Sequence, residues 1–274
     1  MGLDWLLSPE SLTWEMTQER ALLVGGGRAL MLQACHPLVG AGVHQHSAFQ
    51  KDPWTRLRRT SDFYLSLVYA KHADLPSLNR WLEHAHQGVK GQTADGKTYQ
   101  ADQPDLMLWV QATLADSVAW AYCQIWGPLP CNKMDQYWLE QKILGEAIQI
   151  DMSVLPDSWQ GFQEWMDKQY QHLQITPAAE AVMEHLQNLP VALPGIPAAA
   201  WKMGLPLSKK VSRQAVLAGL PNNVRSSLDI EWTPQDQAEW QKTCRRLSLL
   251  LKIIPSPLRH SHHARQAMRQ HQIS

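Results

Sequence analysis

The stretch PWTRLRRTSDFYLSLVYA, residues 53–70, predicts a helix with one apolar side. Asp52 is a suitable N-cap before it, and the proline that opens the stretch suits the first helical turn. Leu57, Tyr64 and Val68 then recur at helical spacing and form an apolar stripe. Because this periodicity dominates the chain and no segment shows clear strand alternation, the sequence predicts an all-α fold.

Two polar residues, Arg56 and Thr60, accompany that stripe one helical turn apart, so their side chains can point into the same space. The next predicted helix, residues 77–89, places Leu82 and, one turn later, His86 on one apolar face. A lone histidine in such a position is more often a satisfied core residue than a ligand. A buried guanidinium or imidazole without a partner is strongly unfavourable, so this region requires an acidic partner or a bound ligand.

The rest of the chain follows the same helical pattern. An Asp-Gly turn within residues 93–99 indicates a small hairpin, the glycines at 25–27 are expected to break a helix, and five prolines within residues 189–206 indicate a packed connector. Further helices are predicted over residues 12–24, 28–35, 41–49, 103–126, 133–148, 158–173, 177–188, 212–218 and 235–254.

Composition limits the possible partners. Of the 274 residues, 45% are hydrophobic and 18% are charged, fewer than the roughly 25% of an average soluble domain. The 25 basic and 25 acidic side chains cancel, so no overall field would draw the chain to nucleic acid or acidic lipid. We therefore expect no nucleic-acid partner, while the low charge leaves room for a homo-oligomer.

Cysteine placement and the N-terminal residues favour a cytoplasmic protein. The four cysteines, Cys35, Cys123, Cys131 and Cys244, form no Cys-x-x-Cys pair, which argues against a zinc ribbon or a disulfide framework. The first residues lack the basic start and apolar run of a secretory signal. The longest apolar run, residues 21–43, is interrupted by polar residues and a proline, so no transmembrane anchor is expected.

Four segments in order resemble one family: GGGRALMLQACHPLVGAGVHQHSAF (25–49), DPWTRLRRT (52–60), HQGVKG (86–91) and TADGKTYQADQPDLMLWVQATLADS (93–117). They are similar to the latex clearing proteins, or rubber oxygenases, and the MpaB-type oxygenases, a group of all-helical proteins that bind haem b. The likeness covers about residues 15–260. It implies one domain over residues 1–274, with a globin-like helical core around a haem pocket and a polar tail at 261–274.

The resemblance assigns roles to the residues that the helical pattern singled out. His86 stands where the family has its proximal haem ligand, so it is expected to bind the iron. Arg56 and Thr60 match a distal Arg-x-x-x-Thr pair, whose donors could stabilise dioxygen by charge-assisted hydrogen bonds. From the residues alone, a salt bridge for Arg56 and a packing role for Thr60 remain open.

Further residues are cofactor-binding candidates through the same resemblance. Lys90 aligns with a family arginine and could bind a haem propionate, while Arg28 and His36 lie in the first motif. Arg59 stands where relatives can have an iron-ligating lysine, but an arginine does not lose its proton and should not coordinate. Asp116 could receive Arg28 or Arg56 as a buried ion pair. Relatives have an arginine at the position of Glu83 and a histidine at that of Gln111, so the roles of those two family residues are not expected in this chain.

The resemblance implies an oxygenase that activates dioxygen and cleaves a C=C bond of an apolar, isoprenoid-type substrate. Two other interpretations stay open: a haem-binding sensor or carrier without turnover, and a haem-free helical protein whose pocket binds another ligand.

Overall fold

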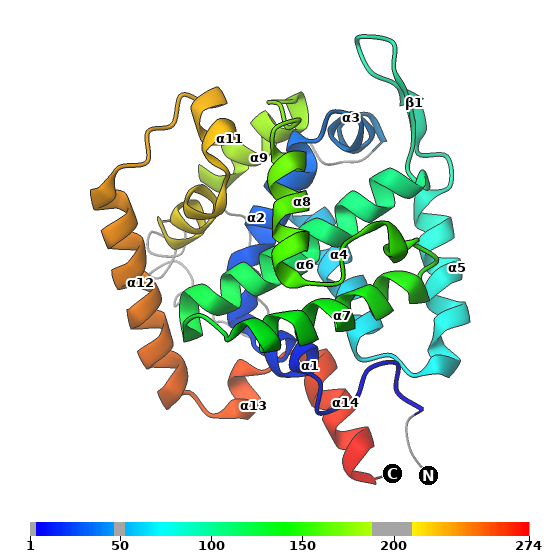
Figure 1. The fold of residues 1–274 in the computed structure, drawn as a ribbon, viewed down its shortest axis with the longest axis vertical. Helices are drawn as coiled ribbons and strands as arrows, with labels where there is room; N and C mark the ends of the chain where they lie inside the picture. Colours follow the sequence, from blue (N-terminus) through cyan, green and yellow to red (C-terminus); the bar gives the residue numbers. More distant parts are fainter. Residues whose placement is uncertain (1–3, 47–52, 188–209, 274) are drawn as a thin grey trace.

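The computed structural model describes residues 4–46, 53–187 and 210–273, and most of them are helical (Figure 1). This confirms the all-α prediction. The N-terminal half contains α1 (Leu12–Thr17), η1 (Arg20–Leu22), α2 (Leu23–Cys35), α3 (Pro37–His46), α4 (Pro53–Val68), η3 (His72–Asp74), α5 (Leu75–His86), β1 (Lys90–Gln92), β2 (Thr98–Gln100) and α6 (Pro104–Trp126). The C-terminal half contains α7 (Cys131–Ala147), η4 (Met152–Val154), α8 (Trp159–Tyr170), α9 (Pro177–Gln187), a helix over 210–219, α11 (Asn222–Ser227), α12 (Pro234–Ile253), α13 (Ser256–Arg259) and α14 (His262–Ile273).

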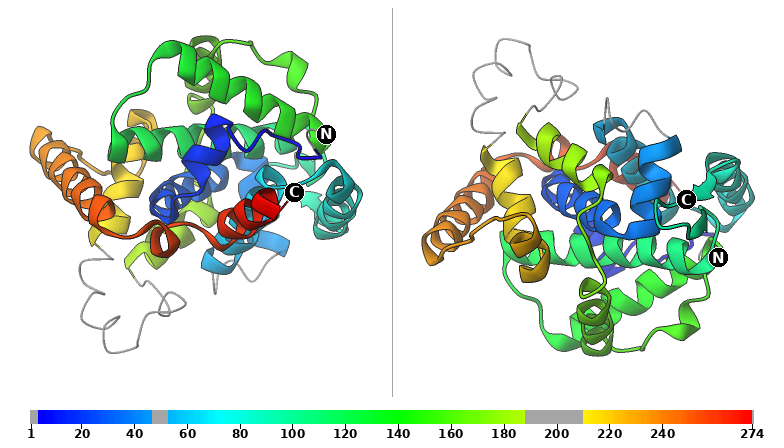
Figure 2. Two further views of the ribbon diagram at one scale, coloured as in Figure 1. Left: turned by 90° about the horizontal axis from the view of Figure 1, so that it is seen from below. Right: turned by 90° about the horizontal axis from the view of Figure 1, so that it is seen from above.

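Helices α2 and α6 pack against each other in the middle of the molecule, and α3, α4 and α9 also pack on α2 (Figures 1 and 2). Gly25, Gly26 and Gly27 lie inside α2, so the prediction that they break a helix is wrong. The actual interruption is at η1, before α2 begins. A Cβ atom at Gly25 would lie 2.5 Å from the Ser117 carbonyl oxygen, so the missing side chain lets the two backbones approach closely.

Gly25→Ala is expected to lower the free energy of unfolding by about 1–3 kcal/mol, because the added methyl group meets α6 backbone that cannot move aside. Gly26→Ala is the matched control, since its Cβ would touch only the end of the Leu57 side chain, 3.0 Å away. Both variants gain helix propensity, so their difference in chemical denaturation measures the clash. Equal stabilities would show that α2 and α6 can separate without penalty.

The predicted hairpin is confirmed. Strands β1 and β2 pair antiparallel with Gly91 opposite Tyr99, and Gly96 in the connecting turn has φ +83°. The Tyr99 hydroxyl donates to Gln45 Oε1 at 2.7 Å, and His46 Nε2 lies 2.8 Å from the Lys90 carbonyl oxygen. These contacts fasten the hairpin to α3 directly after α5 ends.

Helix α5 runs back along α4 after the turn at η3, and the two helices pack together through Phe63 and Trp81, whose rings stack at 5.0 Å. Because Arg56 comes two turns before Phe63 and His86 follows Trp81 by five residues, this pairing brings the two residues to the same end of the helix pair.

Several boundaries differ from the expectations. Helix α3 begins at Pro37 instead of residue 41, because proline suits a first helical turn. The polar tail forms α14, which packs against α4 and buries Ala264 and Ala267. The expected N-cap Asp52 and the expected proline-rich connector at 189–206 lie outside the described residues. Among the helices that the structure describes, none has the length and apolar character needed to cross a membrane.

Candidate functional site

Arg56 is the most unusual polar side chain near the α4–α5 pair. Part of the residue reaches the surface, but its Nε atom is fully buried and has no hydrogen-bond partner among the described residues. Burial lowers the pKa of Arg56 to about 10. The guanidinium therefore keeps its charge at neutral pH, with at least one donor available to a ligand.

His86 lies at the end of α5 and is partly buried. Burial lowers the pKa of its imidazole, the charge of Arg56 lowers it further, and Asp102 opposes the shift. The packing of α4 on α5 places the two side chains at the same end of the helix pair, where the charge of Arg56 acts on the imidazole. At neutral pH the imidazole is consequently neutral, which is the form that binds metal ions.

His86 lines a cleft of about 810 Å³ between α5, the hairpin and the adjoining ends of α6 and α7. Apolar side chains from four separate segments form part of its wall: Leu82 on α5, Val89 before β1, Met107 on α6 and Ile148 after α7. Exposed polar residues, including Glu83, His84, Lys90 and Asp102, lie along the same cleft. The hairpin thus places Lys90, a predicted cofactor contact, beside the same space as His86.

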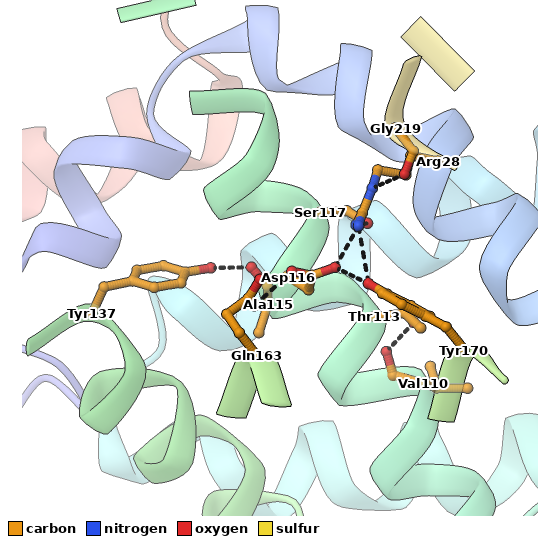
Figure 3. A network of polar contacts seen from close by, with 10 residues as sticks. All are labelled: Arg28, Val110, Thr113, Ala115, Asp116, Ser117, Tyr137, Gln163, Tyr170 and Gly219. Atoms are coloured by element: carbon orange, nitrogen blue, oxygen red, sulfur yellow. Dashed lines mark hydrogen bonds and ion pairs between the residues drawn. The ribbon is translucent and has the colours of Figure 1, made fainter. Parts of the chain in front are cut away.

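Arg28 belongs to a different environment, a buried network between α2, α6 and α8 (Figure 3). It forms an ion pair with Asp116 at 2.6 Å, and its Nε donates to the Gly219 carbonyl at 2.7 Å. Its remaining nitrogens donate to Ser117 Oγ at 2.8 Å and to the Tyr170 hydroxyl at 3.0 Å. Of the two partners considered for Asp116, the structure selects Arg28.

The charged and polar groups of this network are paired with one another. The Tyr170 hydroxyl donates to Asp116 at 2.6 Å, and Gln163 Nε2 donates to the other carboxylate oxygen at 3.0 Å. Burial would lower the pKa of Arg28, but Asp116 and Tyr170 outweigh it and leave the pKa raised. Burial and the Asp116 charge raise the pKa of Tyr170, so its hydroxyl keeps its proton. Every nitrogen of Arg28 is already engaged by protein groups, so this position is built for structure, and its role in cofactor binding stays a prediction.

The other predicted residues lie around these two centres. Thr60 is partly buried one turn after Arg56, whereas Arg59 is exposed on α4. His36 lies between α2 and α3, where its Nδ1 accepts from the Val39 amide at 3.3 Å and its ring lies 5.8 Å from that of Trp109. Burial lowers the pKa of His36, and Asp105 opposes this. Of the predicted site residues, His86 and Lys90 line the cleft. The others do not line it as the described residues define it, and these include the expected distal pair Arg56 and Thr60.

Two further side chains on α6 resemble Arg56 in having unused buried donors. Gln111 Nε2 and Trp109 Nε1 are buried without a hydrogen-bond partner in the described parts of the chain. Gln111 lies one turn after Met107, which lines the cleft. Gln111 departs from the family pattern, so the sequence marked this position as unusual. Nothing in the sequence predicted an unsatisfied donor there.

Comparisons with known proteins agree with this arrangement of motifs. The family model described as "ER-bound oxygenase mpaB/B'/Rubber oxygenase, catalytic domain" matches residues 13–249. The chain is similar to an uncharacterized protein of Mycobacterium bovis and to one of Mycobacterium tuberculosis. Each is 24% identical over 230 residues, covering 82% of this chain and 87% of the relative. No solved structure matches the chain at a significant level. The chain therefore belongs to the family of mpaB-type and rubber oxygenase catalytic domains.

Proposed function

We propose that this protein is a haem-b-dependent oxygenase that uses dioxygen to act on an apolar substrate, with His86 as the iron ligand. The observation that carries the proposal is a buried guanidinium nitrogen on Arg56, without a partner in the described residues, beside a partly buried and neutral His86. An unsatisfied buried donor is unfavourable, and a bound ligand that accepts its hydrogen bond removes that cost.

The chemistry of the residues present fits haem b. A neutral imidazole suits iron, and the apolar side chains Leu82, Val89 and Met107 suit a porphyrin face. Lys90 offers a positive charge at the cleft for a propionate, although as a single point charge and not as the fork of an arginine. Arg56 and Thr60 share one side of α4 and would provide the distal donors.

When bound, the haem supplies the redox chemistry of dioxygen activation. The chain's own groups would then bind and orient. Arg56, charged at neutral pH, donates hydrogen bonds and cannot act as a base. Gln111 can donate from Nε2 but cannot take up a proton, so the protein has no proton acceptor where relatives have a histidine. The apolar cleft residues offer a contact surface for a hydrophobic substrate.

For the reaction itself, we propose oxidative cleavage of a C=C bond in an isoprenoid-type substrate. The family description, which includes rubber oxygenase, supports this choice, as do the apolar residues along the cleft.

The decisive test is haem binding by purified protein, followed as the Soret absorption band during titration with haem. We expect one haem per wild-type chain and loss or altered ligation in His86→Ala, because the only proposed iron ligand is removed. His84→Ala is the sharpest comparison, since His84 lines the same cleft two residues earlier. His72→Ala, exposed on η3, is the neutral control.

The outcomes separate the interpretations. Haem loss in His84→Ala with retention in His86→Ala would show that His86 is not the iron ligand and that His84 is. A wild-type protein that shows no Soret band after haem addition would favour the haem-free ligand-binding protein. Haem with two strong axial ligands that resists carbon monoxide in the ferrous form would favour a sensor or carrier.

A further inference from the structure

The C-terminal part of α12 and the short helix α13 expose several large apolar side chains. Ile253 is 80% exposed, Leu258 66% and Leu249 62%, and Leu250 and Ile254 are also exposed. Such side chains usually occur singly on a protein surface. Here they lie within ten residues of sequence, and we call them, together with the basic residues named below, the α12–α13 patch.

Leu249 and Ile253 of the patch lie on the side of α12 that does not pack against the protein. On the opposite side, Trp240 stacks on Trp120 at 5.9 Å and donates to Gln124 Oε1 at 2.8 Å, and Cys244 one turn later is buried. At about 100° per residue, Leu249 lies about 180° and Ile253 about 140° around the helix from Trp240, so they face outward. Figures 1 and 2 show α12 at the edge of the molecule.

Positive charge surrounds these apolar side chains. Residues 240–274 contain seven Lys or Arg and no Asp or Glu, so the other 239 residues carry 18 basic and 25 acidic side chains. The balanced total therefore hides a strongly basic C-terminal segment. Exposed basic residues flank Leu249 and Ile253 on the outward face of α12: Lys242, Arg245, Arg246 and Lys252. Among the described residues, none of these four forms an ion pair.

We propose that the α12–α13 patch docks on the surface of an anionic phospholipid bilayer. Aliphatic side chains at the centre of the outward face would enter the interface between headgroups and acyl chains, while the flanking arginines and lysines contact lipid phosphates. This is the pattern of helices that lie in the plane of a membrane surface. It requires neither a transmembrane helix nor a bound haem.

The charge pattern favours a lipid surface over other partners. In a symmetric dimer through this patch, the same surface of each copy would meet, and the four basic side chains would oppose four others of like charge. Nucleic acid would attract the arginines, but it offers no apolar phase for Leu249, Ile253 and Leu258. An anionic bilayer satisfies both sets of side chains at once.

The test is co-sedimentation of the full chain with vesicles of phosphatidylcholine, with or without phosphatidylserine. We expect binding to the phosphatidylserine-containing vesicles that weakens with added salt. Arg245→Gln/Arg246→Gln should weaken this binding roughly 30-fold, because each basic residue near an anionic surface contributes about fivefold. Leu249→Ser/Ile253→Ser should weaken it at least about tenfold.

The matched control is Leu139→Ser/Val154→Ser, which removes two exposed apolar side chains from α7 and η4 and should bind like wild type. All substituted side chains are exposed, so circular dichroism and haem retention should not change. The proposal is overturned if wild-type protein stays in the supernatant, if the patch variants bind as wild type does, or if the patch variants instead abolish a dimer seen without vesicles. None of these results would alter the haem-binding test.

Discussion

Replacing Asp116 with alanine should lower the free energy of unfolding by about 3–5 kcal/mol, the largest stability change that we expect from a single side chain. The carboxylate is 5% exposed and accepts from Arg28, Tyr170 and Gln163. Without it, the Arg28 guanidinium remains buried between α2 and α6 with no counter-charge. Thermal or urea unfolding monitored by circular dichroism measures the change.

Asp105→Ala is the control for this prediction, since Asp105 is an exposed acid in the first turn of the same helix and should lower stability by at most about 1 kcal/mol. Asp116→Leu combined with Arg28→Met should recover much of the loss, because apolar residues of similar volume can replace a buried ion pair. If Asp116→Ala is as stable as Asp105→Ala, the network does not hold α2, α6 and α8 together.

Arg56→Met should have two effects of opposite sign. In the cofactor-free protein, it removes an unpartnered buried donor and is expected to raise the free energy of unfolding by about 1–3 kcal/mol. If Arg56 is a distal donor, as proposed, oxidation of an apolar substrate should fall about 100- to 1000-fold, the usual effect of losing one preorganised hydrogen-bond donor. Urea denaturation and oxygen consumption measure the two quantities separately.

Arg59→Met provides the comparison, because Arg59 is an exposed arginine three residues later on the same helix. It should leave stability and turnover close to wild type. A destabilised Arg56→Met protein would mean that the guanidinium has a stabilising partner, and unchanged turnover would remove Arg56 from the distal side.

Local patterns in the sequence were enough to predict the elements that frame the cleft. Helical periodicity placed α4, α5 and α6 within a few residues of their observed bounds, and the Asp95-Gly96 turn indicated the hairpin. The proximity of Arg56 and His86 follows from two adjacent helices packed in opposite directions. Because Arg56 and His86 are close in sequence, the spacing of residues along the two helices is enough to predict which helix ends meet.

Contacts between distant segments could not be predicted in the same way. From its neighbours in the sequence, Gly25 is predicted to break a helix. Its actual role, which is to allow close packing of α2 on α6, depends on the α6 backbone that lies against it. Asp116 could be matched to Arg28 or Arg56 by charge, but Tyr170 and Gln163, about fifty residues away, complete the network through tertiary packing. The overall charge balance likewise concealed the α12–α13 patch, because acids elsewhere in the chain cancel its positive charge.

Because the exposed basic residues of the α12–α13 patch lie on one side, the molecule is electrically asymmetric although its net charge is zero. An anionic surface would exert a torque on it before contact and turn α12 and α13 toward itself. Figures 1 and 2 show α12 on one side of the molecule and α5 with the hairpin on the other. A protein oriented in this way would hold α5 and the hairpin, which line the cleft, away from the bilayer. Hydrophobic molecules would then reach the cleft through water or on a carrier instead of diffusing directly out of the bilayer.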